Sequence, residues 1–217
     1  MPKLPIPIKI PKGCSLQISQ SFGDSSRIKW YEANGINIPI HNGVDIVVLK
    51  YGIENQRETY GASLLLPSPE WRVVKITFDS PMSTKGNGVT LESPSFQEND
   101  IEKRLQVVFW HCSDTTPKGN VVAYTGNSGL VTPKPTAEQP YNGSHLHLMV
   151  FEWWFDGLNW KLHQSDNGVK GALNPMFRFN LLPQQYGEED MLKDLQPLQR
   201  MVAIASQRLK DLVESLF

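Results

Sequence analysis

The chain has 217 residues, of which 40% are hydrophobic and 20% are charged, and these proportions are typical of globular domains and unlike those of disordered or fibrous chains. Its 21 basic and 22 acidic residues leave a formal net charge of -1 at pH 7, so no overall positive field exists to hold nucleic acid or an anionic membrane. We therefore expect one sizeable domain with no nucleic-acid partner.

The first residues and the apolar runs indicate where the protein is made. Prolines at positions 2, 5, 7 and 11 interrupt the stretch in which a secretory signal needs an unbroken apolar run, so we predict no signal peptide and synthesis in the cytoplasm. No later run approaches the roughly 18 to 20 apolar residues of a spanning helix, so no membrane span is expected. Two cysteines, Cys14 and Cys112, have neither the spacing of a structural zinc site nor the density of a disulfide-stapled domain. The redox compartment is left open.

From about residue 14 to about residue 182, short apolar segments alternate with turn signals, a pattern typical of an antiparallel β-rich domain. The Asp156-Gly157 pair lies between an aromatic segment that ends at Phe155 and a second segment, Leu158–Leu162, and so predicts a hairpin. Two stretches without periodicity, 51–60 and 130–143, are expected to be surface loops. The candidate strands are Arg72–Phe78, Gly88–Glu92, Leu105–His111, Val121–Thr125 and His145–Trp154.

The chain changes character after Gly187, because residues 188–217 contain no glycine and their apolar residues recur at helical spacing. We divide the chain into a β-rich domain, 1–187, and a C-terminal amphipathic helix, 188–217. The helix either packs on its own domain or joins copies of the chain into a homo-oligomer, and the sequence leaves both open. Its apolar residues form the seam of a heptad pattern: Leu195, Leu198, Val202, Ala205, Leu209, Leu212 and Leu216.

Two pairs of potential metal ligands stand out. In His145-Leu146-His147 the two-residue period of a strand puts both imidazoles on one face. His41 and Asp45 project to the same side if their segment is extended, and Gly43 between them allows a sharp approach if it is not. Each pair alone is a weak signal. A catalytic zinc, however, needs three protein ligands and one open position, which two such pairs can supply with a histidine to spare.

At these residues the sequence resembles the lysostaphin-type or LytM-like zinc endopeptidases, which cut peptide cross-bridges of bacterial peptidoglycan. The family's first signature, His-x-x-x-Asp, is similar to the segment from His41 to Asp45, and its last, His-x-His, is similar to the segment from His145 to His147. The family's strand that ends in an aromatic residue, one further residue and a histidine resembles Phe109-Trp110-His111. The resemblance covers about residues 15–178, and further segments agree in order and approximate spacing: Ser21–Asp24, Leu66–Val74, Lys85–Val89, Pro117–Val121 and Thr125–Gly129.

The resemblance implies both a fold and a site. The fold is an antiparallel β-sheet sandwich of the duplicated-hybrid-motif type, to which the C-terminal helix is an addition. The site is one zinc ion bound by His41, Asp45 and His147, with His111 and His145 as the catalytic histidines that act on the water and on the developing oxyanion. Which of these two histidines takes which role is left open.

Several residues are expected to have no part in the chemistry. Cys112 neighbours His111, but neighbours on a strand point to opposite faces and cannot share a proton, so no Cys-His nucleophile is expected. His163 matches nothing in the family and is interpreted as a surface histidine. An aromatic cluster is interpreted as core and hairpin packing rather than a platform for carbohydrate: Trp153, Trp154, Phe155 and Trp160.

The function that the resemblance implies is zinc-dependent hydrolysis of peptide bonds in peptidoglycan stem peptides or cross-bridges. The stretches 51–60 and 130–143 are longer than in short family members, and we expect them to flank the metal site and to affect substrate specificity. Without a signal peptide, action on the cell wall would follow release by lysis or carriage on a virion, as for a phage lysin. Two other classes stay open: a non-catalytic relative that serves as a binding or regulatory module, and a structural protein that assembles through its C-terminal helix.

Overall fold

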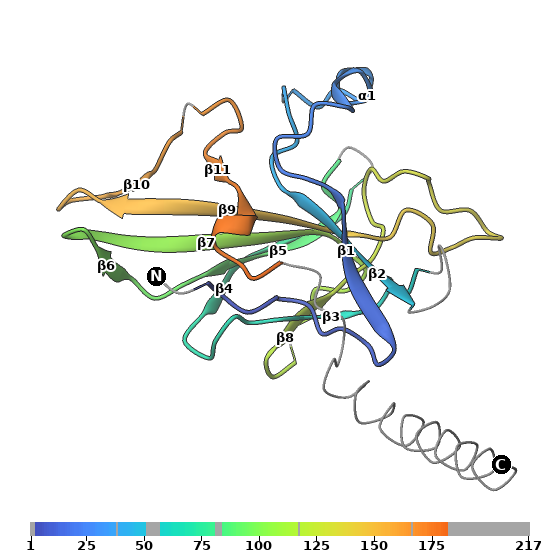
Figure 1. Ribbon diagram of the computed structural model, residues 1–217, viewed down its shortest axis with the longest axis horizontal. Helices are drawn as coiled ribbons and strands as arrows, with labels where there is room; N and C mark the ends of the chain where they lie inside the picture. The colour runs from blue at the N-terminus through green and yellow to red at the C-terminus, as the bar shows by residue number, and fades with distance from the viewer. Residues whose placement is uncertain are drawn as a thin grey trace, which may run out of the picture. The chain divides into compact units, whose positions relative to one another are not determined.

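In the part of the chain that the structure describes, nine strands form one sheet (Figure 1). The computed structural model describes residues 3–37, 39–50, 57–80, 84–116, 118–165 and 167–181. The main path of the sheet has the strand order β1-β2-β9-β7-β5-β4, while β6 pairs with β7, and β10 and β11 pair with β9. All these pairs are antiparallel. The strands are β1 (Cys14–Gln20), β2 (Val44–Lys50), β4 (Arg72–Thr77), β5 (Asn87–Glu92), β6 (Phe96–Glu98), β7 (Ile101–Cys112), β9 (Leu146–Phe155), β10 (Trp160–Leu162) and β11 (Ala172–Leu173).

A second, antiparallel sheet has two strands, β3 (Ser63–Leu65) and β8 (Val121–Tyr124). Helix is scarce in the described part of the chain, where it consists of α1 (Ile28–Ala33) and the single 3-10 turn η1 (Pro175–Phe177). These observations confirm the prediction of a mainly β, antiparallel domain.

Each of the five predicted strands coincides with an observed strand, and the largest difference is that β7 begins at Ile101 instead of Leu105. The predicted hairpin is also confirmed, because β9 and β10 pair on either side of Asp156. The Asp156 carboxylate accepts hydrogen bonds from the backbone N–H groups of Leu158 and Asn159, at 2.9 and 2.7 Å, and so closes the turn. Strands β1, β2, β3, β6 and β11 were not predicted.

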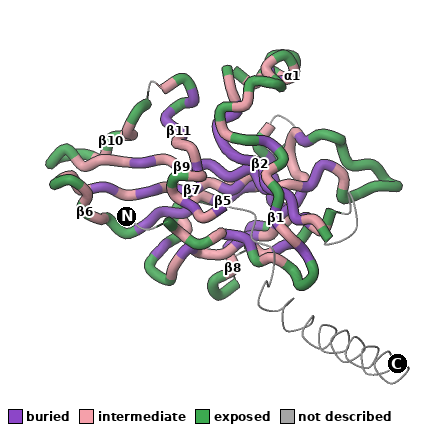
Figure 2. The backbone as a smooth tube through the Cα atoms, in the orientation of Figure 1, coloured by how far each residue is buried: buried purple, intermediate pink, exposed green. Residues whose placement is uncertain are grey.

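One face of the main sheet carries the hydrophobic core. Burial alternates along β7, where Leu105, Val107 and Phe109 are completely buried. They form one cluster with Leu64 of β3 and Val122 of β8, so the small sheet covers this face. Figure 2 shows the buried stretches that run along the central strands. Truncation of a buried side chain such as Phe109 to alanine costs about 3–5 kcal/mol, so this face holds the sheet together.

The opposite face of the central strands brings polar side chains into one row. Asp45 on β2 pairs with His147 on β9, and His147 pairs with Trp110 on β7. Residues that pair across antiparallel strands share a face. Trp110 alternates with the buried core residues of β7, so the row lies on the face turned away from the core.

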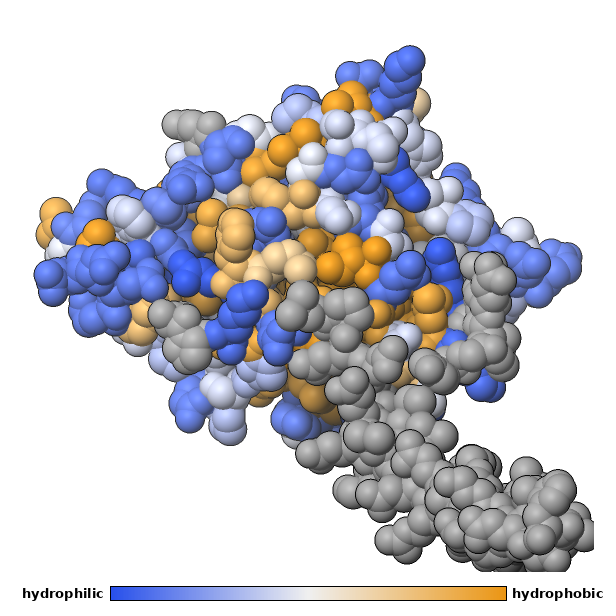
Figure 3. All heavy atoms as spheres, viewed as in Figure 1, coloured by the Kyte–Doolittle hydropathy of each residue, from blue (hydrophilic) through white to orange (hydrophobic). Residues whose placement is uncertain are grey.

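Of the two predicted loops, 130–143 is fully described and lies at the surface. Residues 130–143 contain no helix or strand, and residues 132–141 are exposed. They reach the right edge of the domain in Figure 1, where the side chains seen in Figure 3 are mostly hydrophilic, as expected of a surface loop. Of the predicted loop 51–60, the structure describes residues 57–60. The predicted helix 188–217 lies outside the described residues, and so does the question of whether it forms a homo-oligomer. Within the described ranges, no helix is long and apolar enough to cross a membrane.

Candidate metal centre

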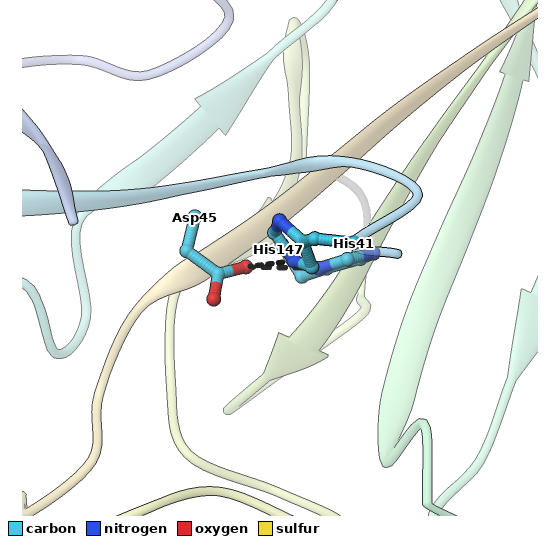
Figure 4. A group of neighbouring side chains, drawn as sticks. All are labelled: His41, Asp45 and His147. Atoms are coloured by element: carbon cyan, nitrogen blue, oxygen red, sulfur yellow. Dashed lines mark hydrogen bonds and ion pairs between the residues drawn. The ribbon is translucent and has the colours of Figure 1, made fainter. Parts of the chain in front are cut away.

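Three buried side chains meet at one point (Figure 4). His41 comes from the turn before β2, Asp45 from β2 and His147 from β9. The Nε2 atom of His41 lies 3.1 Å from Nδ1 of His147 and 3.2 Å from Oδ1 of Asp45, and these last two atoms are 2.8 Å apart. Each residue thus offers one donor atom to a common position, and the group could hold a metal ion.

His41 reaches this point because the chain turns sharply at Gly43, and not because the segment is extended as far as His41. A Cβ atom at Gly43 would lie 2.6 Å from the carbonyl oxygen of Leu148 and 2.9 Å from Nε2 of His147, so only glycine fits against the imidazole. On the other side, Nδ1 of His41 lies 3.0 Å from the carbonyl oxygen of Ser21. That contact fixes the orientation of the ring.

Two more histidines border the group. Nδ1 of His145 lies 2.7 Å from the carbonyl oxygen of Gly143, and its Nε2 lies 3.7 Å from Oδ1 of Asp45. Nδ1 of His111 lies 2.8 Å from the carbonyl oxygen of Ser128, and the His111 ring centre is 4.6 Å from that of His145. A carbonyl can only accept a hydrogen bond. Both Nδ1 atoms therefore carry a hydrogen, so in the neutral imidazole Nε2 keeps the lone pair.

A bulge in β7 turns His111 toward the group. The pairing of β5 with β7 shifts by one residue, so that Trp110 and His111 together lie opposite Gly88. His111 has a φ of 63°, in the left-handed region that a bulge can require. Trp110 stacks on His147 with ring centres 5.1 Å apart. Cys112, the next residue, is buried in the core, and burial raises the pKa of its thiol to about 12, so it does not act with His111.

Close backbone packing fixes the loop that contains Ser128, whose carbonyl contacts His111. The Ser128 hydroxyl accepts a hydrogen bond from the backbone N–H of Asn87 at 2.8 Å. A Cβ atom at Gly86 would lie 2.4 Å from Oγ of Ser128, and one at Gly129 would lie 2.3 Å from the backbone nitrogen of Gly86. Two glycines therefore allow the contact that places the Ser128 carbonyl against the imidazole of His111.

The electrostatics of the cluster favour an ionised Asp45 and neutral imidazoles at His111 and His147. Burial alone would raise the pKa of Asp45, but the electrostatic effect of His145 and the hydrogen bond from His147 hold that pKa well below its usual value. Burial, followed by the neighbouring histidines, lowers the pKa of His111 to about 3, and burial likewise lowers the pKa of His147. Neutral imidazole and carboxylate are the forms that bind metal ions.

The pocket above the cluster contains residues that sequence reasoning missed. It encloses about 120 Å³, which is room for a few water molecules or a small chemical group. Tyr31 of α1 lines it, accepts a hydrogen bond from Nε2 of Gln20 at 2.9 Å, and is stacked beside His41. Burial raises the pKa of Tyr31 to about 12. The adjacent aromatic residues Trp30 and Tyr31 were the only sequence feature that could have predicted this part of the pocket, but no motif connected them to the histidines.

The remaining histidine and the aromatic cluster do not join the metal centre. His163 stacks on Trp154 with ring centres 3.9 Å apart, and its Nδ1 lies 3.5 Å from the buried carboxylate of Glu152, so it is half-buried rather than a fully exposed surface histidine. The aromatic cluster packs in the β9–β10 hairpin, where its residues are half-buried: Phe155 lies against Trp160, and Arg104 lies over Trp153 and Trp160.

A scan against protein-family models and a search of curated proteins each found no match for this chain. The structure does bring together all five residues that the sequence motifs singled out: His41, Asp45, His111, His145 and His147.

Proposed function

We propose that this protein is a zinc-dependent endopeptidase that hydrolyses peptide bonds in bacterial peptidoglycan, in the stem peptides or the cross-bridges. The observation that carries the proposal is the convergence of three metal-binding side chains beside two histidines whose Nε2 atoms keep a lone pair. The resemblance of the same motifs to the lysostaphin-type and LytM-like endopeptidases supports the choice of reaction.

The donor atoms converge in a way that favours a bound cation. His41 donates its Nδ1 hydrogen to the carbonyl oxygen of Ser21, so in the neutral imidazole the Nε2 atom has only a lone pair to present. That lone pair faces Oδ1 of Asp45, another acceptor, at 3.2 Å. His147 has at most one hydrogen on Nδ1 to share between the two. Acceptors at this separation repel one another unless a positive charge lies between them.

Zinc fits this donor set. Zinc binds imidazole nitrogen and carboxylate oxygen at about 2.0–2.2 Å in a tetrahedral arrangement, which places ligand atoms roughly 3.3 Å apart. The observed separations of 2.8, 3.1 and 3.2 Å need only a small outward shift. Two histidines, one carboxylate and an open position are typical of catalytic zinc sites. The Ser21 carbonyl supplies the outer hydrogen bond that sets the tautomer of a metal-binding histidine.

The surrounding residues supply the proton transfers. Bound zinc would polarise the scissile carbonyl and lower the pKa of a water molecule to about 7. The Nε2 atom of His111 or of His145 can accept the proton of that water and later deliver it to the leaving amine. The other histidine, once protonated, can donate a hydrogen bond to the developing oxygen anion. Tyr31 keeps its proton at neutral pH because its pKa is about 12, so it can donate a hydrogen bond to a carbonyl oxygen in the pocket.

The finer points of fold and biology belong to the same proposal. We infer that the two sheets form a sandwich of the duplicated-hybrid-motif type, and that the loop 130–143 affects which peptide is cut. We further propose that the protein reaches the cell wall after release by lysis or as part of a virion. Secretion of the uncleaved protein from uninfected cells would count against that route.

The test measures zinc content and the release of new amino groups from purified peptidoglycan. The parent should bind about one zinc and release amines. His147→Ala should lose both, whereas His111→Gln should keep its zinc and lose activity by about 10²–10⁴-fold. His163→Gln, a histidine change outside the site, should behave as the parent.

Two outcomes contradict the proposal in different ways. Zinc bound by the parent without any amine release would reject peptidoglycan as the substrate. A folded parent that binds no zinc would reject the enzyme and favour a non-catalytic binding module.

A further inference from the structure

The pocket at the metal centre has an uneven charge. Arg27 and Arg57 line it, and Asp45, which belongs to the metal-binding group, is the one carboxylate among its described lining residues. Neither arginine forms an ion pair with a carboxylate in the described ranges. Lys85 adds a third positive charge beside the pocket, because it lies 5.1 Å from the ring centre of the lining residue Trp110.

The two arginines reach the pocket from separate segments. Arg27 lies directly before α1, in the arm between β1 and β2 that stands above the sheet in Figure 1. Arg57 forms an isolated bridge with Leu49 of β2. Leu49 and Asp45 are four residues apart on that strand and share a face, so Arg57 lies on the face that carries the metal centre.

Two arginines at one pocket favour the binding of a negatively charged ligand group. The whole chain has a formal net charge of -1, so the positive charge at this pocket is a local feature. A concave positive site attracts anions and raises their local concentration. Arginine binds a carboxylate through two parallel hydrogen bonds, which adds direction to the attraction.

We propose that Arg27 and Arg57 bind a free carboxylate of the peptide substrate, next to the scissile bond at the metal centre. This inference rests on the proposed peptidase function for the identity of the substrate. It selects between the two peptidoglycan substrates, because an acidic stem peptide carries such a carboxylate and a glycine bridge has no ionised side chain.

The first part of the test compares the binding of one peptide probe in two versions, one with a charged carboxylate and one with a neutral amide. Acetyl-Ala-Glu-amide, made with L- or D-glutamate, and the matching glutamine peptide are titrated into the full chain with added zinc, and tryptophan fluorescence is followed because Trp30 and Trp110 line the pocket. We expect the glutamate peptide of at least one stereoisomer to bind more tightly than its glutamine counterpart, with a ratio of dissociation constants of at least about five. That ratio should fall toward one in Arg27→Gln and in Arg57→Gln.

Lys29→Gln is the matched control, because Lys29 is an exposed cation of α1 and does not line the pocket. It removes the same charge from the same part of the chain and should keep the parent's ratio. A contact between the carboxylate and zinc alone would leave the ratio unchanged in both arginine variants. That result, or a ratio near one in the parent for both stereoisomers, overturns the inference.

The second part separates this inference from the proposed function. Amine release is measured on native peptidoglycan and on peptidoglycan whose carboxylates have been converted to amides. The inference predicts slower release from the amidated material at low substrate concentration, and equal rates contradict it. If neither material is cleaved while the binding ratio depends on the arginines, the proposed function fails and carboxylate recognition stands.

Discussion

Backbone carbonyl groups set the positions of the hydrogen atoms on three histidines at the candidate metal centre. Each carbonyl accepts a hydrogen bond from an Nδ1 atom, at 2.7 to 3.0 Å, and leaves the Nε2 lone pair for other partners. The pairs are Ser21 with His41, Ser128 with His111 and Gly143 with His145. The chain therefore orients these rings before any ligand arrives, and such preorganisation would favour catalysis if the proposed function holds.

The neutral state of His111 should make the metal-free protein less stable in acid. Its pKa is about 3 in the folded protein, against 6.5 for an ordinary histidine. Between these values the unfolded chain binds a proton that the folded chain does not. The free energy of unfolding should therefore fall as the pH drops from about 6.5 to about 3, by up to about 1.4 kcal/mol per pH unit for one such histidine. Denaturant unfolding at several pH values, with a chelator present, measures this.

The contribution of His111 is isolated by its glutamine variant. His111→Gln should show a smaller fall in stability over the same range, whereas His163→Gln should keep the parent's slope. An identical pH dependence in the parent and in His111→Gln would mean that this imidazole is not held neutral in the folded protein.

The residue types of the site could be predicted from the sequence, but their orientation could not. His-x-His and His-x-x-x-Asp are spacings that a motif search finds, and the structure brings their residues together. Regular strand alternation from Trp110 places His111 on the core face, and only the bulge opposite Gly88 brings it to the site. No motif in the sequence linked Tyr31 to the candidate metal ligands.

At the scale of elements, glycine contacts position the two loops that contain Gly86 and Ser128, and the Ser128 carbonyl in turn holds His111. Gly86 and Gly119 have nearly the same φ, 65° and 63°, but a Cβ atom at Gly86 would lie 2.4 Å from Ser128, whereas one at Gly119 would have no neighbour within 4 Å. Alanine at either position has the same backbone strain. Gly86→Ala should therefore lower the free energy of unfolding by at least about 2 kcal/mol more than Gly119→Ala. Denaturant unfolding of both variants measures the difference, and equal losses would show that the Gly86 contact can relax.

The strands that were missed have patterns that alternation does not detect. In β2 the first five residues are all buried, because β2 lies in the interior of the sheet with both faces covered, and a continuous apolar run has no period of two. The start of β7 was hidden by its charges. Lys103 there is buried because it pairs with Glu98 at 2.8 Å and with Glu152 at 3.4 Å, and both partners come from other strands. No local pattern in the sequence shows such pairs.

At the scale of the whole molecule, the candidate metal centre depends on the pairing of strands that are far apart in the sequence. His147 is 106 residues from His41 and 102 residues from Asp45 along the chain, so the three donors meet only when β2 and β9 pair. A ligand that binds the folded chain and not the unfolded one stabilises the fold, by about 2.7 kcal/mol at a free concentration of 100 times its dissociation constant. Zinc binding and folding should therefore be coupled.

The most direct measurement is the number of zinc ions that each folded chain retains after dialysis with zinc, in the parent and in Asp45→Asn. Asp114→Asn, which changes an exposed carboxylate, is the control. We predict about one zinc per chain in the parent and in the control, and none in Asp45→Asn, because the isosteric amide removes the charged ligand while the fold is kept. A folded parent that retains no zinc, or an Asp45→Asn variant that retains as much as the parent, would contradict the account.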